Sequence, residues 1–439
     1  MINASFQWKC EPQAESLALH LLGECTKQHH FLNLLGQELY KKTSTRLFDW
    51  IDHLLVPESK KLSQELHKAG FVEQERNVFY HPGAQLPRII LTSPAQTGVA
   101  LIVDSIANFL MVHHLTSPIE GAPFNGYRKA LVSEENHVFF YVVERRGTLT
   151  LEPTQIPPKG VVTVLQALEA WKTRQRATED MEPTLKLAKK LVASLGQDLA
   201  AWVVCEVERE YWQSKNKAGQ LQKARQDHLG MGWANHDHHT FRSSRRNFSK
   251  LVHLFELLGF QSRERFYAGK EAGWGAQIME NPRARLVLFL DVDLTADEIG
   301  IDFAHQTLPS LKELGTVGLW CALHGDSILQ GGMHHLEAQF MFEELTEELS
   351  KKSVRMMDPF SNFPYLKQAF TEGEVWAVAP EKIQGLLEQG SITAEQAEKF
   401  KSYGAVGSHL ENLQRREGYK GFNQKNVSFI IQKTDPRKA

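Results

Sequence analysis

The chain has 439 residues, enough for two or three domains with sizeable hydrophobic cores. Its 50 basic and 52 acidic residues give a formal net charge of −2, so no net field favours nucleic acid or an anionic membrane. A hydrophobic content of 42% and a charged content of 23% are typical of a globular protein in water. The four cysteines are scattered and form no C-x-x-C pair, which argues against a disulfide framework or a zinc ribbon.

The sequence also argues against secretion and membrane insertion. The first twenty residues lack a basic segment followed by an apolar one, and no apolar run reaches about 18 residues. We therefore expect no membrane span, no membrane or nucleic-acid partner, and a location in the reducing cytoplasm.

The N-terminal third alternates between helical and strand patterns. Leucines at helical spacing predict one or two helices over residues 13–41. A strand over 46–56 and a helix over 59–71 follow, and the Gly-Phe at the end of that helix suits a C-cap. Two short strands around 76–81 and 87–93 complete this first unit.

A second unit repeats this alternation. It begins with a strand over 98–106, continues through a helix over 107–115, and returns through strands over 127–134 and 137–147. The segment 164–227 then has a largely helical pattern that separates this part of the chain from the C-terminal half.

The most informative segment runs from Gly232 to Glu280. If residues 234–242 are extended, side chains alternate between two faces. One face then carries His236, His238, Thr240 and Arg242, and the other Asp237, His239 and Phe241. Imidazole is the commonest metal ligand and Arg binds carboxylates through two hydrogen bonds, so the first face suits a metal with an anionic ligand.

The remaining elements are less distinctive. We expect strands over 285–294 and 316–327 and a helix over 333–352. Ser391, Thr393 and Glu395 indicate the start of a helix near the C-terminus.

The two halves share a short internal echo. Residues 51–71 and 236–260 each contain an Asp-His pair on a strand, then an amphipathic helix, then Gly-Phe. This pattern predicts a repeated β-α-β-β unit.

The segments DHHTFRSS, LFELLGFQSRERFYAGKEAGWGAQIMENP and RLVLFLDVDL together resemble the 2-oxoadipate dioxygenase/decarboxylase (hydroxyglutarate synthase) family of the vicinal oxygen chelate superfamily. Residues 99–147 also resemble a module of that superfamily. The resemblance covers roughly a quarter of the chain. It implies an α+β fold of repeated βαβββ modules with added helices.

The family binds one divalent iron through two His and one Glu, which implies a metal site here. The first ligand matches His238, and Arg242 falls on the matching Arg, where it would hold a substrate carboxylate. The second His is expected on the first strand of the next module, for which His324 is the candidate. Glu411, in SHLENLQRREG, is the candidate for the third ligand, with Glu374 as its rival.

Other polar groups have more ordinary interpretations. His236 shares a face with His238 and is an alternative ligand, whereas adjacent histidines on a helix would point apart, which argues against a zinc site at His334, His335 and Glu337. His53 and Glu144 occupy analogous places in the N-terminal half. The strand at 98–106 brings no His to them, so we expect a structural copy there. Three tryptophans are expected in the core or a pocket wall: Trp233, Trp274 and Trp376.

Four regions follow from these patterns: an N-terminal helical segment (1–45), a non-catalytic module pair (46–155), a helical connector (156–228) and a metal-binding catalytic domain (229–439). The resemblance implies an Fe(II) dioxygenase/decarboxylase that acts on a 2-oxo (di)carboxylic acid and O₂. A metal-dependent lyase, isomerase or hydrolase, or a non-catalytic binding protein, is the alternative on the same fold.

Overall fold

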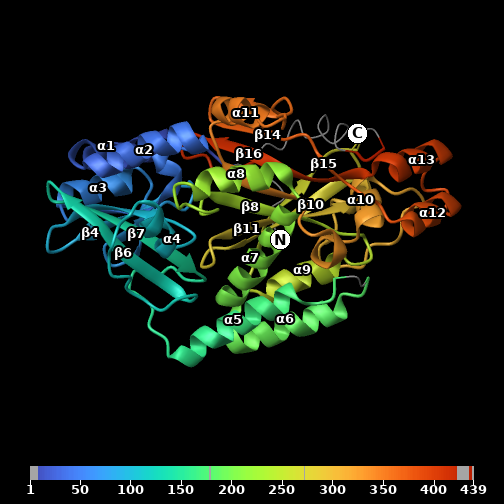
Figure 1. Cartoon of the computed structure of the whole chain (residues 1–439), viewed down its shortest axis with the longest axis horizontal. Coiled ribbons are helices and arrows are strands. Elements are labelled where there is room, and N and C mark those ends of the chain that lie inside the picture. The colour runs from blue at the N-terminus through green and yellow to red at the C-terminus, as the bar shows by residue number, and fades with distance from the viewer. Residues whose placement is uncertain (1–7, 177–178, 271, 423–434, 438–439) are drawn as a thin grey trace.

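The computed structural model describes residues 8–176, 179–270, 272–422 and 435–437 (Figure 1). The first half of the chain forms a seven-stranded sheet and the second half a nine-stranded sheet, and helices pack around both. Within the described residues, no helix combines the length and apolar character needed to cross a membrane.

The N-terminal sheet has the strand order β2-β3-β4-β1-β5-β7-β6. Its helix α3 begins after Ser59, whose hydroxyl accepts a hydrogen bond from the amide of Leu62. The hairpin between β6 and β7 turns through Asn136 and His137, both at positive φ, as a tight turn between twisted antiparallel strands requires. Its elements are β1 (Ile51–Pro57), α3 (Lys60–Lys68), β2 (Val72–Glu75), β3 (Val78–Tyr80), β4 (Arg88–Thr92), β5 (Thr97–Ile102), α4 (Ile106–Val112), β6 (Gly126–Glu135) and β7 (Val138–Arg146).

The C-terminal sheet has the order β13-β14-β16-β12-β8-β11-β10-β9, and β15 pairs with β16. Its elements are β8 (His236–Arg242), α9 (Phe248–Leu257), β9 (Gln261–Tyr267), β10 (Trp274–Asn281), β11 (Leu286–Asp293), β12 (His335–Gln339), α11 (Phe342–Ser350), β13 (Ser361–Phe363), β14 (Leu366–Phe370), β15 (Glu374–Trp376) and β16 (Ala405–Arg415).

The two sheets repeat one topology. In the first, β1 lies between a parallel β4 and an antiparallel β5, and β5 pairs in parallel with β7. In the second, β8 lies between a parallel β11 and an antiparallel β12, and β12 pairs in parallel with β16. The predicted α+β fold of repeated modules with added helices is therefore confirmed, and the Asp-His echo marks the first strand of each half.

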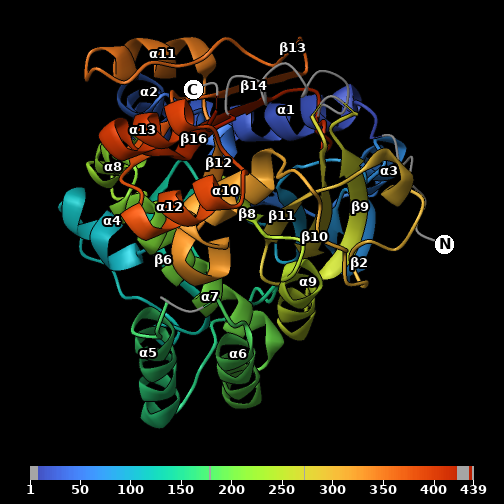
Figure 2. The same ribbon diagram turned by 90° about the vertical axis from the view of Figure 1, so that its right-hand side faces the viewer.

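The added helices connect the sheets and cover their surfaces (Figure 2). The described residues between 158 and 227 form the helices α5, α6, α7 and α8, and Thr393 caps α13, as its sequence indicated. These helices are α1 (Pro12–Gln28), α2 (His30–Thr43), α5 (Pro158–Lys172), α6 (Glu182–Leu195), α7 (Gln197–Ser214), α8 (Lys217–Asp227), α10 (Thr316–His324), α12 (Pro380–Glu388) and α13 (Ala394–Tyr403), with short turns η1 (Leu47–Trp50), η2 (Ala296–Glu298) and η3 (Ser327–Gly331).

Two predicted elements are wrong. Residues 316–324 form helix α10 rather than a strand. Side chains on nearly all sides of this helix are buried, and a short apolar run of this kind is compatible with either a buried helix or a buried strand. The predicted helix over 333–352 begins only at Phe342, and strand β12 occupies the preceding residues. As a result, His324 lies on a helix and His335 lies on a strand.

The expected alternation along β8 is interrupted at its start. Opposite β12, His238 pairs with Glu337 and His236 with the next residue, so Asp237 is skipped in a β-bulge. The bulge turns His236 toward His239, and their rings lie 5.3 Å apart. His236 and His238 therefore do not share a face, whereas the alternation from His238 onward is regular.

One face of the C-terminal sheet packs on the main hydrophobic core. Phe241 on β8 is fully buried and its ring lies 5.1 Å from that of Phe255 on α9. Trp233 belongs to the same core, as expected. Since side chains alternate beyond the bulge, the neighbours of Phe241 on β8 point to the opposite face, where polar groups gather.

Candidate metal centre

Three adjacent strands place four ionisable side chains together on the polar face of the C-terminal sheet. Glu337 on β12 lies directly opposite His238 on β8 and beside Glu411 on β16. His335 lies two residues before Glu337, on the same face. We call His238, His335, Glu337 and Glu411 the histidine–glutamate cluster.

The cluster is compact and buried. One ligand atom from each of His238, His335 and Glu411 lies within 4.8 Å of the others. The Nε2 of His238 is 2.6 Å from Oε2 of Glu337, and the Nε2 of His335 is 2.8 Å from Oε2 of Glu411. The four residues are at most 7% exposed. Two imidazoles thus face two carboxylates in a place that water hardly reaches.

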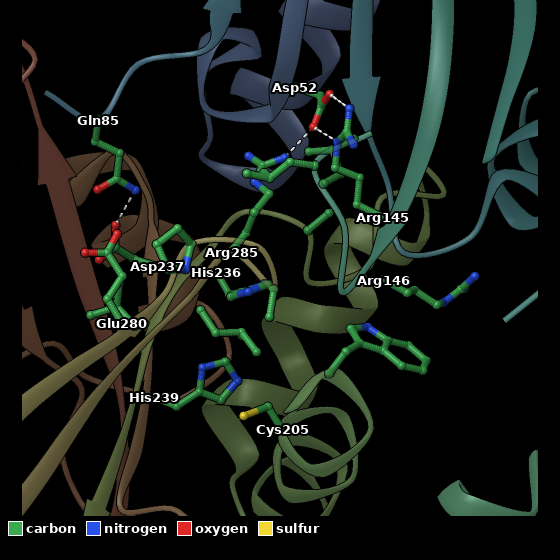
Figure 3. A pocket seen from close by; sticks show the side chains of 18 of the residues that line it. Asp52, Gln85, Arg145, Arg146, Cys205, His236, Asp237, His239, Glu280 and Arg285 are labelled. Carbon is green, nitrogen blue, oxygen red and sulfur yellow. Dashed lines mark hydrogen bonds and ion pairs between the residues drawn. The ribbon is translucent and has the colours of Figure 1, made fainter. Parts of the chain in front are cut away.

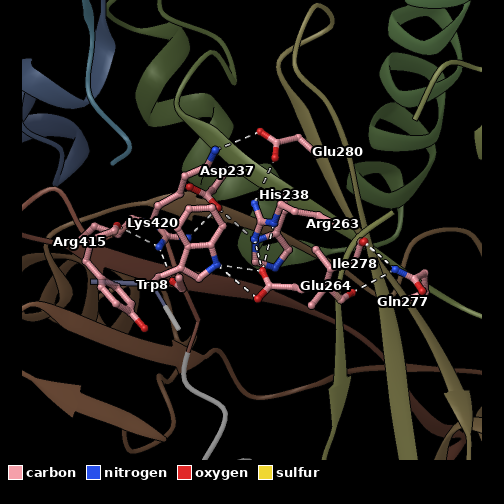
Figure 4. Close-up of polar contacts among 12 residues, drawn as sticks. Trp8, Asp237, His238, Arg263, Glu264, Gln277, Ile278, Glu280, Arg415 and Lys420 are labelled. Carbon is pink, nitrogen blue, oxygen red and sulfur yellow. Dashed lines mark hydrogen bonds and ion pairs between the residues drawn. The ribbon is translucent and has the colours of Figure 1, made fainter. Parts of the chain in front are cut away.

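A surrounding set of hydrogen bonds orients the cluster (Figure 4). The Nδ1 of His238 lies 3.2 Å from Oδ1 of Asp237, which accepts its proton and leaves Nε2 directed at the cluster. Arg415 at 3.1 Å and Gln85 at 2.7 Å hold the two oxygens of Asp237. Arg415 also lowers the pKa of Asp237 against the effect of burial, which keeps this carboxylate ionised.

Burial and mutual charge set the protonation of the cluster. Burial and the nearby Glu411 raise the pKa of Glu337 to about 8, and burial raises that of Glu411 to about 7. Burial opposes protonation of His238, but Glu337 and Asp237 outweigh it and raise its pKa to about 9. Two buried carboxylates side by side disfavour their ionised forms, so a cation placed between them would be strongly stabilised.

A small cavity of about 70 Å³ adjoins the cluster. Aromatic and aliphatic side chains form most of its wall, and Thr240, Asp291 and Gln368 are polar members. The apolar members are Phe266, Trp274, Ile278, Phe289, Phe360, Phe370 and Phe422. A ligand in this space would be shielded from water, which strengthens its electrostatic contacts with the cluster.

Arg242 lies at the far end of the same strand, where its guanidinium is only 4% exposed. Its Nε is 3.9 Å from Oδ2 of Asp291, too long for a hydrogen bond. Among the described residues neither Nε nor Nη1 of Arg242 has a hydrogen-bond partner. Burial raises the pKa of Asp291 to about 7, so this carboxyl is not a full counter-charge at neutral pH. A buried guanidinium with free donors is suited to an anionic ligand.

The structure brings together some of the sequence-predicted residues and separates others. His238 and Glu411 lie in the cluster. His324 lies on α10, where its Nε2 donates to the carbonyl of Val406 at 3.1 Å. Glu374 lies on β15 and accepts a hydrogen bond from the amide of Lys217. His236 contacts Trp233 and Arg209 on the other side of the bulge.

Sequence reasoning missed His335 and Glu337. The second histidine was expected on the first strand of the next module, and the strand in that place is β12, whose first residue is His335. The segment His335–Gln339 was instead assigned to a helix that begins later. The signal was present as the alternation of His335 and Glu337, which puts both side chains on one face of a strand.

The N-terminal half lacks most of this cluster. Its bulge also skips an aspartate, Asp52, before a histidine, and Arg145 grips Asp52 as Arg415 grips Asp237. In the matching register, however, Gly98 takes the place of His335, Ala100 that of Glu337, and Tyr141 that of Glu411.

A metal position beside His53 in this half would therefore have few donors. Glu144 does not face His53 across a metal position. Its carboxylate binds the guanidinium groups of Arg128 and Arg146 and the amide of Ile106.

Comparisons with known proteins give no family assignment: no protein family model and no curated protein sequence match this chain. Solved structures that are similar in parts include a candidate hydrolase from Shewanella frigidimarina NCIMB 400 (13% identity, 51% of this chain and 98% of that chain, TM-score 0.35). A mutant of 4-hydroxymandelate synthase from Streptomyces coelicolor matches at 11% identity over 89% of this chain and 99% of that chain, with a TM-score of 0.31. Methylmalonyl-CoA epimerase from Mycobacterium tuberculosis matches at 10% identity over 42% and 89%, with a TM-score of 0.24.

Proposed function

We propose that the chain is a mononuclear metal-dependent enzyme that oxidatively decarboxylates a 2-oxo (di)carboxylic acid with O₂. The observation that carries the proposal is the convergence of His238, His335 and Glu411 from three adjacent strands onto one buried point. This set replaces His324 of the sequence-based expectation with His335 and retains the other two residues.

The donor set suits a divalent transition metal. Two imidazole nitrogens and one carboxylate oxygen on one side of an ion leave other coordination positions open, which is the arrangement of non-haem iron oxygenases. Asp237 fixes the tautomer of His238 in the way that carboxylates commonly orient metal-bound histidines. Glu337 offers a further carboxylate beside the same point. Fe(II) is our choice of metal, because the sequence resembles an iron-dependent family.

The bound metal would supply the redox chemistry in which O₂ is reduced and the 2-oxo acid loses CO₂. The chain itself binds and shields the substrate. Arg242 offers a substrate carboxylate guanidinium donors that have no partner among the described residues, and the aromatic wall of the cavity excludes water. Thr240 lies between His238 and Arg242 on β8, and its buried hydroxyl has no partner among the described residues, so it can donate to a substrate oxygen.

Metal analysis and oxygen uptake test the proposal. The purified protein is stripped of metal, loaded with Fe(II) without oxygen, and mixed with 2-oxoadipate, 2-oxoglutarate or pyruvate before O₂ is admitted. We expect about one iron per chain, with O₂ consumed and CO₂ released only when an oxo acid is present. Substrate turnover without O₂ uptake would indicate a lyase, isomerase or hydrolase instead. A protein that binds no metal would contradict the proposal.

A further inference from the structure

A cavity of about 690 Å³ lies between the two halves of the chain, apart from the cavity of the histidine–glutamate cluster (Figure 3). Both halves line it: β1 and β7 from the first, the start of β8 and the turn between β10 and β11 from the second, together with α7. Neither His335, Glu337 nor Glu411 is among its lining residues. Its size is that of a typical small-molecule site.

One end of this cavity carries an excess of positive charge around Asp52. Arg145 binds this carboxylate through two hydrogen bonds of 2.6 and 2.8 Å. Arg285 forms an ion pair with the same carboxylate from the other half of the chain, and Nη2 of Arg88 lies 3.6 Å from it. Three guanidinium groups therefore surround one negative charge.

The donors of these arginines are not all used. Arg145 also donates to the carbonyl of Thr150, so it is well satisfied. The Nη2 of Arg88, by contrast, is buried and has no hydrogen-bond partner among the described residues. Burial and the neighbouring guanidinium groups lower the pKa of Arg88 to about 10, although Asp52 acts to raise it. A second anion beside Arg88 and Arg285 would relieve this repulsion.

The opposite end of the cavity carries an unpartnered histidine. Figure 3 shows His239 and Cys205 across the open space from Asp52 and Arg145. His239 is fully buried, and neither of its ring nitrogens has a hydrogen-bond partner in the described part of the chain. A neutral imidazole offers one donor and one acceptor, so both ring nitrogens can bind a ligand. Buried polar groups without a partner are rare, and a ligand is one way to satisfy them.

We propose that this cavity is a second ligand site, for a small organic anion. A carboxylate or phosphate group would lie against Arg88 and Arg285, and a hydroxyl or carbonyl group of the same molecule would reach His239. Because Arg285 belongs to one half and Arg88 to the other, the ligand would bridge the two halves of the chain.

Calorimetric titration of the metal-free full chain tests this proposal, with citrate and inorganic phosphate as the probes. We expect citrate to bind, and Arg285→Gln and Arg88→Gln each to weaken binding about tenfold or more, the usual scale for losing a charge-assisted hydrogen bond. Arg283→Gln is the matched control, since Arg283 lies in the same turn, is 69% exposed and pairs with Asp198. It should bind citrate like the unaltered protein.

The two probes distinguish carboxylate from phosphate recognition. Binding of citrate alone indicates a polycarboxylate ligand, and binding of phosphate as well indicates a general anion site; both support the proposal. Failure of both probes to bind, or equal weakening by Arg283→Gln, overturns it. His335→Ala, which should lose metal, should keep citrate binding, so failure here is distinguishable from failure of the metal site.

Discussion

Arg285 and Asp52 join the two halves of the chain. Arg285 lies in the turn between β10 and β11 and forms an ion pair with Asp52 on β1. A second contact joins the halves in the opposite direction: Gln85, in the loop between β3 and β4, donates to Asp237 on β8. The β3–β4 loop and the β10–β11 turn occupy equivalent positions in the two halves. Each of them contacts an aspartate of the other half, and that aspartate precedes the histidine on the first strand there.

We expect Asp52→Asn to destabilise the protein by about 3–5 kcal/mol, because it leaves three guanidinium groups without their buried counter-charge. Urea unfolding at pH 7 measures the change. Glu24→Gln is the control, since Glu24 forms a surface ion pair with exposed Lys27 and its loss should leave the unfolding midpoint unchanged. A midpoint for Asp52→Asn equal to that of the control would show that the arginines find other partners.

The two histidine candidates for the second metal ligand can be separated directly. His335→Ala should lose bound metal, because it removes an imidazole of the cluster, whereas His324→Ala should retain it, because that side chain lies outside the cluster and donates to the carbonyl of Val406. Elemental analysis after metal loading gives the result, with far-UV circular dichroism to confirm folding. The reverse pattern would restore His324 and remove His335.

The sequence predicts the elements better than it predicts the site. The Asp-His echo identifies the first strand of each half, because a strand with a polar pair followed by an amphipathic helix is a local pattern. The apolar segment of α10 is compatible with either a helix or a strand, because its local sequence has no periodicity that distinguishes the two. The meeting of Glu337 with Glu411 depends on strand order and register, which single-sequence periodicity does not contain.

The bulge at Asp237 could not be predicted either. Strict alternation places His236 with His238, and one skipped residue separates them. The same bulge occurs at Asp52, where Arg145 makes the same contact as Arg415 at Asp237. The bulge therefore recurs with an Asp–Arg pair, which is a tertiary feature of the repeat rather than a local preference.

His53→Ala should leave metal content and turnover within a few-fold of the unaltered protein. The N-terminal half places Gly98 and Tyr141 where the cluster has His335 and Glu411, so too few donors remain for a metal ion. Metal analysis and a turnover assay, with His238→Ala as the comparison that should lose metal, measure the effect. Complete loss of activity in His53→Ala would place the active site in the first half.

One ion pair outside both sites should make stability depend on pH. Arg245 donates to Glu298 and lowers the pKa of this carboxyl to about 2. A carboxyl whose pKa is lower in the folded state stabilises the fold above its unfolded pKa near 4.5, and this contribution disappears as the pH falls toward 2.

The contribution is at most roughly 3 kcal/mol at neutral pH, from the size of the shift. We expect Glu298→Gln to lower the free energy of unfolding at pH 7, and the difference from the unaltered protein to shrink below pH 4.5. Urea unfolding at several pH values follows this difference. A difference that stays constant down to pH 3 would mean that the charge of Glu298 does not contribute.

Arg242→Lys should impair substrate binding while metal content stays intact. The guanidinium of Arg242 has fixed, planar donors, of which Nε and Nη1 lack a partner among the described residues, and the ammonium group of Lys cannot reproduce that geometry. We expect the Kd for the oxo acid to rise about tenfold or more, measured by titration of the metal-loaded protein without oxygen. Arg355→Lys is the control, because Arg355 is 77% exposed and pairs with Glu372. If Arg242→Lys binds the oxo acid as tightly as that control, Arg242 acts as a structural partner of Asp291, and the substrate carboxylate is held elsewhere.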